Sequence, residues 1–188
     1  KHITSIIDGD RGSNYPNENE TVEDGILFLS SKNIKGQKLN LENKRFITVS
    51  KFESLGRGKL QKHDLIIPVR GSIGNCCVFD HPDHETGFIN AQMMILRPER
   101  NLVDPLFLHL ISQCSPWKYQ LDILAYGTAQ QQLSNNILAN LSFPFPGITE
   151  QKDILDHVLN ENQHRDNLIE KNETKVRLLQ EYRQSLIS

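Results

Sequence analysis

The stretch that decides the architecture runs from residue 149 to residue 187 and reads TEQKDILDHVLNENQHRDNLIEKNETKVRLLQEYRQSLI. It contains no glycine and no proline, so nothing in it interrupts helical hydrogen bonding. Thr149 is a favourable N-cap, and Glu150 complements the positive end of the helix dipole. About 38 helical residues extend roughly 57 Å, well beyond an average globular helix. The sequence therefore predicts a long C-terminal helix, residues 148–188, as a spacer and dimerisation domain.

Heptad spacing places ten residues along one stripe of this helix, and six of them are apolar. Arg165 and Arg183 occupy two of the remaining positions. The other eight form the candidate helix-pairing surface: Leu155, Val158, Asn162, Ile169, Asn172, Val176, Leu179 and Leu186. Asparagine at such positions lowers stability but specifies register and partner. We therefore expect a paired coiled coil; a helix folded back on its own domain is the alternative.

Residues 1–147 predict a mainly β domain with short helices, so the fold class is α+β. Turn-forming residues are dense after Asp8, which predicts a long loop over residues 8–25. Apolar, β-rich runs predict strands at residues 26–30, 45–49, 64–69, 87–96 and 141–145. Ser50 and Glu53 have the spacing of a capping box. Three short helices are expected after the N-cap residues Asp104, Ser115 and Ser134.

The charge of the chain is unevenly distributed. The formal net charge is −2, but residues 32–62 contain nine Lys and Arg and two Glu, a net charge of +7, so the remainder carries −9. A local positive field attracts phosphates even when the rest of a protein is acidic. The basic segment therefore indicates a nucleic-acid contact, with a solvated lysine-rich surface as the alternative.

Composition argues against several classes of protein. No stretch approaches the roughly 18 apolar residues of a membrane span, and the first residues do not resemble a signal peptide. The three cysteines form no Cys-x-x-Cys zinc pattern, and an odd number suits a disulfide framework poorly. We therefore expect Cys76, Cys77 and Cys114 to be reduced core thiols of a cytoplasmic protein.

Sequence motifs of catalysis are absent. There is no Gly-rich phosphate loop ending in Gly-Lys-Ser/Thr, no Gly-x-Gly-x-x-Gly after a strand, and no Asn/Asp-Pro-Pro-aromatic motif of an amino-methyltransferase. His81, Asp83 and His84 are neighbours in one turn and do not make a metal site without further ligands. Asp83 lies 90 residues from Glu173, which excludes a compact nuclease signature. We expect a non-catalytic chain with no cofactor and no bound metal.

One combination of motifs resembles a known family. Residues 127–133 read GTAQQQL and are followed by Leu138, Leu141, Pro144, Pro146, Glu150-Gln151 and Ile154. This closely resembles the junction between a target recognition domain and its conserved helix in specificity subunits of type I restriction-modification systems. Residues 178–188 are similar to the end of that helix, and residues 59–66 with 70–74 to the core of the domain. The resemblance covers most of the chain.

The resemblance implies a division of labour. Two recognition domains of a specificity subunit each read half of a bipartite double-stranded DNA target, and conserved helices hold them apart. Modification subunits bind S-adenosylmethionine and methylate adenines, and restriction subunits cleave. Because only one unit is present and the chain starts at Lys1, we expect either a fragment or a half-sized subunit that pairs with a second copy of itself or a second recognition domain.

DNA binding requires cations for phosphates and directional donors and acceptors for base edges. The expected phosphate contacts come from the basic segment: Lys32, Lys35, Lys38, Lys44, Arg45, Arg57 and Lys59. The expected base contacts come from loops: Arg11, Asn14, Tyr15, Ser31, Asn33, Arg70, Ser72, Asn90, Gln92, Gln130 and Gln131. Two alternatives remain open: a scaffold protein that uses the long helix and binds no DNA, and the recognition end of a fused restriction-methyltransferase.

Overall fold

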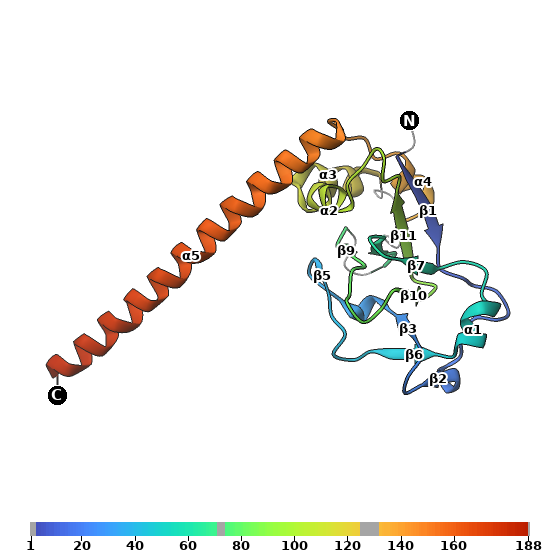
Figure 1. The fold of residues 1–188 in the computed structure, drawn as a ribbon, viewed down its shortest axis with the longest axis horizontal. Coiled ribbons are helices and arrows are strands. Elements are labelled where there is room, and N and C mark those ends of the chain that lie inside the picture. The colour runs from blue at the N-terminus through green and yellow to red at the C-terminus, as the bar shows by residue number, and fades with distance from the viewer. Residues whose placement is uncertain (1–2, 71–73, 125–131, 188) are drawn as a thin grey trace. The chain divides into compact units, whose positions relative to one another are not determined.

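The computed structural model describes residues 3–70, 74–124 and 132–187, and Figure 1 shows it as a ribbon. The chain divides into two compact units, Lys1–Ile148 and Thr149–Ser188. The first unit combines β-sheets with short helices, and the second is part of one long helix. This confirms the predicted α+β fold class with a long C-terminal helix.

Most of the first unit consists of short strands. Their bounds are β1 (Thr4–Asp8), β2 (Thr21–Val22), β3 (Ile26–Leu29), β4 (Ile34–Lys35), β5 (Lys38–Leu39), β6 (Arg45–Ile47), β7 (Lys59–Gln61), β8 (Leu65–Pro68), β9 (Cys77–Val78), β10 (Thr86–Ile89) and β11 (Met93–Pro98). They form a four-stranded sheet in the order β1-β11-β8-β9, a five-stranded sheet in the order β2-β6-β3-β10-β7, and the hairpin β4-β5. Within the described strands, β3 and β10 pair in parallel, and the other pairs are antiparallel.

Short helices complete the unit. They are η1 (Glu18–Glu20), η2 (Ser31–Asn33), α1 (Val49–Ser54), α2 (Pro105–Gln113), α3 (Ser115–Leu124) and α4 (Asn135–Ala139). The predicted caps at two of them are confirmed, because the Asp104 side chain accepts from the Leu106 N–H and the Ser134 side chain from the Ile137 N–H. At α1 the prediction was wrong by two residues. Thr48, not Ser50, is the N-cap, and its hydroxyl accepts from the Lys51 N–H.

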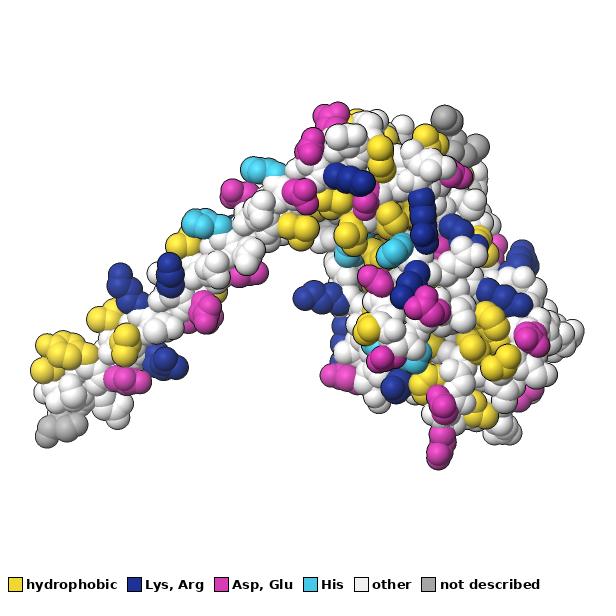
Figure 2. Space-filling model, viewed as in Figure 1, with side chains coloured by type: hydrophobic (Ala, Val, Ile, Leu, Met, Phe, Trp, Pro, Cys, Tyr) yellow, Lys and Arg dark blue, Asp and Glu magenta, His cyan; other side chains and the backbone are white. Residues whose placement is uncertain are grey.

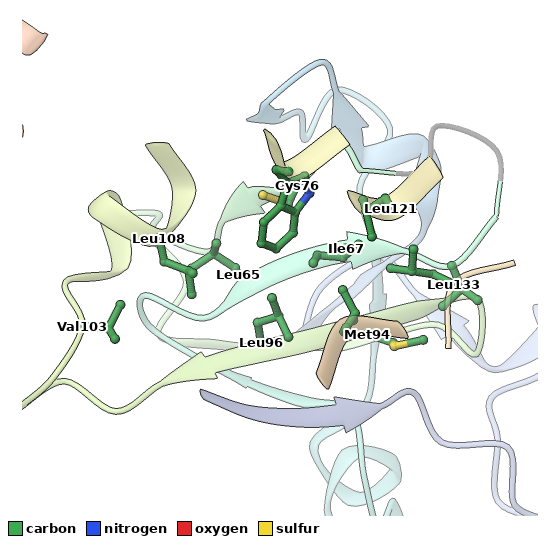
Figure 3. Packing of buried hydrophobic residues seen from close by; sticks show 12 residues of the cluster. Leu65, Ile67, Cys76, Met94, Leu96, Val103, Leu108, Leu121 and Leu133 are labelled. Carbon is green, nitrogen blue, oxygen red and sulfur yellow. The ribbon is translucent and has the colours of Figure 1, made fainter. Parts of the chain in front are cut away.

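Alternating side chains on the central strands build two main layers of core. On β8, Leu65 and Ile67 face a cluster that includes Leu108, Leu121 and other residues of the helices, whereas Ile66 faces the five-stranded sheet. Figure 3 shows the first of these clusters, with β8 and β11 beneath the helices. The four-stranded sheet is therefore buried on both faces. A third, smaller cluster around Phe28 covers the outer face of the five-stranded sheet.

A buried ion pair fixes the turn between β7 and β8. The Asp64 carboxylate, 2% exposed, accepts from the Nε and Nη2 of Arg97 at 2.9 and 2.8 Å, and from the Gln61 N–H at 2.8 Å. These bonds raise the pKa of Arg97. His63 takes a left-handed conformation in the turn, with φ of 68°. The aspartate of the 59–66 motif is thus a structural residue that joins the turn to β11.

Two predicted strands differ from the structure. The expected strand 87–96 is broken at Asn90, because β10 belongs to the five-stranded sheet and β11 to the four-stranded sheet. The Asn90 side chain accepts from the Gln92 N–H, and its carbonyl from the Met93 N–H, which closes a turn between them. The expected strand 141–145 is irregular chain without strand pairing to any described residue. Aromatic packing holds it instead: the Phe143 ring stacks on Trp117, and Pro144 has no N–H to donate.

The cysteines also differ partly from expectation. Cys76 and Cys77 are buried, and burial raises the pKa of each thiol to about 12, so both are inert thiols at neutral pH. Cys114 is exposed, so the prediction that it belongs to the core was wrong. All three are free thiols.

The long helix is α5 (Ile148–Ile187), 40 residues in length. At 1.5 Å per residue this corresponds to about 60 Å. Several large hydrophobic side chains towards its C-terminal end are more than half exposed, among them Ile169, Val176, Leu179 and Leu186, whereas Leu155 and Val158 are half-buried. Figure 2 shows such side chains along α5, interspersed with Lys, Arg, Asp and Glu. The helix therefore presents apolar surface of the kind that pairs with another helix.

Candidate nucleic-acid interface

A polar hollow lies at one edge of the five-stranded sheet. Because β3 and β10 are parallel, with Ile89 opposite Leu29, their carboxyl ends meet at the same edge. The Asn90 N–H donates to the Leu29 carbonyl at 2.8 Å, which holds the residues after the two strands side by side. Strand β6 is antiparallel to β3, with Arg45 opposite Phe28, so the start of β6 reaches this edge too.

The polar hollow has a volume of about 670 Å³ and is lined by residues that follow β3, precede or begin β6, and follow β10: Ser30, Ser31, Lys32, Asn43, Lys44, Arg45, Asn90 and Gln92. Three of these described residues are cations and five are neutral hydrogen-bonding side chains, with no carboxylate among them. Cations suit phosphates, and amides and hydroxyls suit base edges. The polar hollow thus combines both kinds of group that a DNA reader needs.

Packing beneath the polar hollow orients its cations. The Arg45 guanidinium lies over the Phe28 ring, 5.1 Å from its centroid, and the Lys44 ammonium lies 5.6 Å from the centroid of Phe46. Both side chains are exposed, so their charged ends face solvent while the rings fix their direction. The sheet therefore presents positive charge in a defined place.

Asn33, expected to contact bases, has a structural position. It is 4% exposed, and its Oδ1 accepts from the Ser30 N–H at 2.9 Å and the Ser30 hydroxyl at 3.2 Å. Its Nδ2 donates to the Asn40 carbonyl at 3.1 Å. These bonds use its amide inside the protein and orient Ser30 in the polar hollow.

The loop after β1 packs against the turn at Asn90. A Cβ on Gly9 would lie 2.3 Å from the Asn90 carbonyl oxygen, so this close approach requires glycine. The Tyr15 ring packs on Phe28 and Phe88, and its hydroxyl accepts from the Ala91 N–H at 3.4 Å. Tyr15 therefore anchors the loop, and its part-buried ring supports the polar hollow from below.

Asp10 joins the same loop to the segment after α1. Its carboxylate accepts from the backbone N–H groups of Gly12, Gly56 and Arg57, and these bonds lower the pKa of Asp10. Arg11 and Arg57 are exposed on the two segments that Asp10 connects. The Asn14 side chain also has a hydrogen-bond partner within the protein, because its Nδ2 donates to the Ser54 carbonyl at 3.3 Å. This loop presents both Arg11 and the hydrogen-bonded Asn14 to solvent.

Four of the other five lysines of the basic segment contact acidic or carbonyl groups. Ion pairs join Lys35 to Glu42 at 2.7 Å, Lys51 to Glu20 at 2.7 Å, and Lys62 to Glu85 at 2.5 Å. Lys59 donates to the Glu53 carbonyl at 3.2 Å and lies over the Phe52 ring. Lys38 is exposed on the β4-β5 hairpin. The net charge of +7 is thus divided among several surfaces.

Arg70 follows β8 and lies beside the polar hollow. The Val69 N–H donates to the Gln92 carbonyl at 2.8 Å, which ties this segment to the turn that lines the polar hollow. The Arg70 side chain is exposed and donates to Oε1 of Gln132. Ser72, Gln130 and Gln131, predicted as base contacts, lie outside the described residues.

Six of the eight residues in the polar hollow are predicted contacts; Ser30 and Asn43 were missed. Ser30 is the last residue of a predicted strand and Asn43 directly precedes a Lys-Arg pair, so position at a strand end was the available signal. Gln132 was missed too, although it belongs to the same glutamine run as Gln130. Within the described residues there is no group of three or more His, Cys, Asp or Glu able to hold a metal. Nor does any described helix combine the length and apolar character needed to cross a membrane.

Comparison with known proteins identifies the family. The model of the type I restriction modification DNA specificity domain matches residues 3–175, and the chain belongs to this family. It is also similar to the type I restriction enzyme EcoBI specificity subunit of Escherichia coli, with 25% identity over 141 residues. That match covers 74% of this chain and 29% of the E. coli protein.

Solved structures have the same fold. A chain from work on complex assembly and conformational transition of the type I R-M system matches with a TM-score of 0.64, 16% identity, and coverage of 88% of this chain and 37% of that one. The HsdS subunit from Thermoanaerobacter tengcongensis matches with a TM-score of 0.59 and 17% identity. This match covers 86% of this chain and 36% of the HsdS chain. The type I restriction-modification S subunit from M. genitalium matches with a TM-score of 0.52 and 15% identity. This match covers 88% of this chain and 38% of the S subunit chain. The chain thus spans little more than a third of these proteins.

Proposed function

We propose that this chain is a sequence-specific DNA-binding module that reads one half of a bipartite target within a type I specificity subunit. The polar hollow is the observation that carries the proposal. Its cations, Lys32, Lys44 and Arg45, would contact phosphates, and the amides of Asn90 and Gln92 would contact base edges. Membership of the DNA specificity family supports the same assignment.

We assign pairing to the exposed apolar stripe of α5. The partner would be a second copy of the chain or a second recognition domain, and the two paired helices would set the distance between half-sites. Asn162 and Asn172 on the stripe would specify register. In this scheme the chain catalyses nothing itself; modification subunits bring S-adenosylmethionine and methylate adenine, and restriction subunits dock on the same assembly.

The DNA half of the proposal is tested by mapping methylation. The specificity protein that carries this chain is expressed with its modification subunits, and methylated adenines are located by sequencing. We expect one bipartite motif, with identical inverted half-sites if the chain pairs with itself and different ones if a second recognition domain is present. Methylation without a defined motif would contradict the proposal. Binding of S-adenosylmethionine by the purified chain alone would favour a fused methyltransferase.

The pairing half is tested on α5 with matched lysine substitutions. The pair Ile169→Lys and Val176→Lys places two charges on the apolar stripe, whereas Asn167→Lys and Thr174→Lys place two on the opposite face, one heptad apart in each case. Sedimentation should show that the first pair abolishes self-association or docking of the second domain and that the control pair preserves it. Equal behaviour of the two pairs would contradict pairing through this stripe.

A further inference from the structure

Arg70 is held in place by two backbone connections. The Val69 N–H donates to Gln92 at 2.8 Å, and the Leu133 N–H donates to the Val69 carbonyl at 2.9 Å. Leu133 is 1% exposed and belongs to the core cluster beneath the helices. The residues on either side of this contact, Arg70 and Gln132, are therefore carried on fixed backbone next to the polar hollow.

The Gln132 amide occupies one edge of the Arg70 guanidinium. Its Oε1 accepts from Nε at 3.3 Å and from Nη2 at 2.9 Å. A guanidinium has five N–H donors in a planar fork. The distal edge, made of Nη1 and the second hydrogen of Nη2, lies away from the bonded edge and presents two parallel donors. Guanine presents the matching pair of acceptors, O6 and N7, in the major groove.

The chemistry of the partner separates Arg70 from the other paired cations. Arg97 is held by the Asp64 carboxylate, and Lys35 and Lys62 by glutamates, so their charges are compensated within the protein. Gln132 is neutral, so it orients the Arg70 side chain and leaves its full positive charge. Holding an exposed arginine in one orientation costs side-chain conformational entropy. Such orientation matters for a base edge, whereas a phosphate contact needs charge without a set angle.

We propose that Arg70 reads a guanine through its distal edge and that Gln132 is the positioning residue that aims it. This inference rests on the proposed function and deepens it by naming the base class at one position. The phosphates beside that base pair would lie against the cations of the polar hollow, which Gln92 connects to Arg70.

The test uses the specificity protein assembled with its modification subunits. Methylation is measured on duplexes that carry each of the four base pairs at every position of the mapped half-site. Arg70→Ala should lower the preference for guanine at one position by about 10- to 100-fold and leave the other positions unchanged. Arg70→Lys should weaken the same preference while retaining total DNA affinity, because lysine keeps the charge and can donate to guanine but lacks the planar fork.

Gln132→Leu should reduce preference at that same position by a smaller factor, and the slope of affinity against salt should stay unchanged. Gln113→Leu removes a different glutamine amide, exposed on α2, and is the control, expected to leave every position unaltered. Equal losses on all sequences would make Arg70 a phosphate contact and overturn the inference, as would a half-site without a G·C pair. A wild-type assembly without any motif would instead refute the proposed function itself.

Discussion

Two groups of cations in residues 32–62 have different surroundings. Lys32, Lys44 and Arg45 line the polar hollow, where the described lining contains no carboxylate. Lys35, Lys51 and Lys62 each form an ion pair with a glutamate. The pairing has an electrostatic signature, because the hydrogen bond with Lys35 lowers the pKa of Glu42 and the hydrogen bond with Glu85 raises the pKa of Lys62.

This difference between the hollow-lining and the ion-paired cations arises mainly from sheet topology, which decides where the cations of residues 32–62 lie. The cations of the polar hollow follow β3 or open β6, and the parallel pairing of β3 with β10 brings asparagine and glutamine beside them. Lys51 and Lys62 lie where glutamates from other segments approach, whereas Lys35 pairs with Glu42 within the same segment. We therefore expect the first group to govern DNA binding and internal cation pairs to govern, at most, stability. Four predictions test this division.

The largest effect is expected at the buried pair of Asp64 and Arg97. Asp64→Ala removes three hydrogen bonds to a carboxylate that is 2% exposed, beside an arginine side chain that is 29% exposed. Discounted for that exposure, the free energy of unfolding should fall by about 2–3 kcal/mol. Urea unfolding measures it, with Lys44→Gln as a control that should stay within about 0.5 kcal/mol of wild type. A small change for Asp64→Ala would show that internal cation pairs do not stabilise this unit.

Next in size is the loss of discrimination on removing an amide from the polar hollow. Gln92→Ala keeps the backbone bonds of the turn but removes a candidate base contact. We expect the preference for target over non-target duplex to fall by about 1–3 kcal/mol, as measured by competition binding. Gln61→Ala is the matched control, since Gln61 is an exposed glutamine beside Thr86, at the other end of β10. If Gln92→Ala and Gln61→Ala lowered the preference for target duplex equally, the polar hollow would not be the surface that discriminates between sequences.

A smaller effect is expected for the arginines carried by the Asp10 loop. Arg11→Gln or Arg57→Gln should each lower the slope of log affinity against log salt by about 0.9 if the side chain contacts one phosphate. The slope is measured by filter binding over a range of salt, with Arg100→Gln as control. Arg100 donates to the Lys62 carbonyl, away from this loop in sequence. An unchanged slope for both variants would confine phosphate contacts to the polar hollow.

The smallest effect is the pH dependence contributed by Asp10. Its pKa is below the ordinary value of 3.8 because backbone N–H groups, that of Gly12 first, donate to the carboxylate. The stabilisation is therefore complete above about pH 4 and is lost as the pH falls through the lowered value. Stability measured by urea unfolding should decline less steeply below pH 4 in Asp10→Asn than in wild type. Parallel curves would show that Asp10 does not hold the loop through its charge.

Local signals in the sequence sufficed for part of the fold. The caps Asp104 and Ser134 and the uninterrupted residues 149–187 act within a turn or along one helix, so they predicted α2, α4 and α5. The break at Asn90 could not be predicted from the apolar run, because it depends on two sheets that share the segment. The expected strand 141–145 failed similarly, because Trp117 packing holds that segment.

The candidate site was predictable as residue types, not as a place. Six members of the polar hollow were named from charge and hydrogen-bonding capacity, but they come from segments about 60 residues apart that only the β3-β10 pairing unites. Burial of Asn33 and the ion pair of Lys51 with Glu20 are likewise tertiary outcomes. The sequence alone therefore does not distinguish the polar residues that line the polar hollow from those that are buried or ion-paired.

The most direct test compares two triple variants with the same change in charge. One replaces Lys32, Lys44 and Arg45 with Gln, and the other replaces Lys35, Lys51 and Lys62 with Gln. The slope of log affinity against log salt is measured for each variant of the assembled specificity protein. The first should lower the slope by about 2 to 3, in line with three lost phosphate contacts, and the second by less than about 1. Equal decreases would contradict the assignment of DNA binding to the polar hollow.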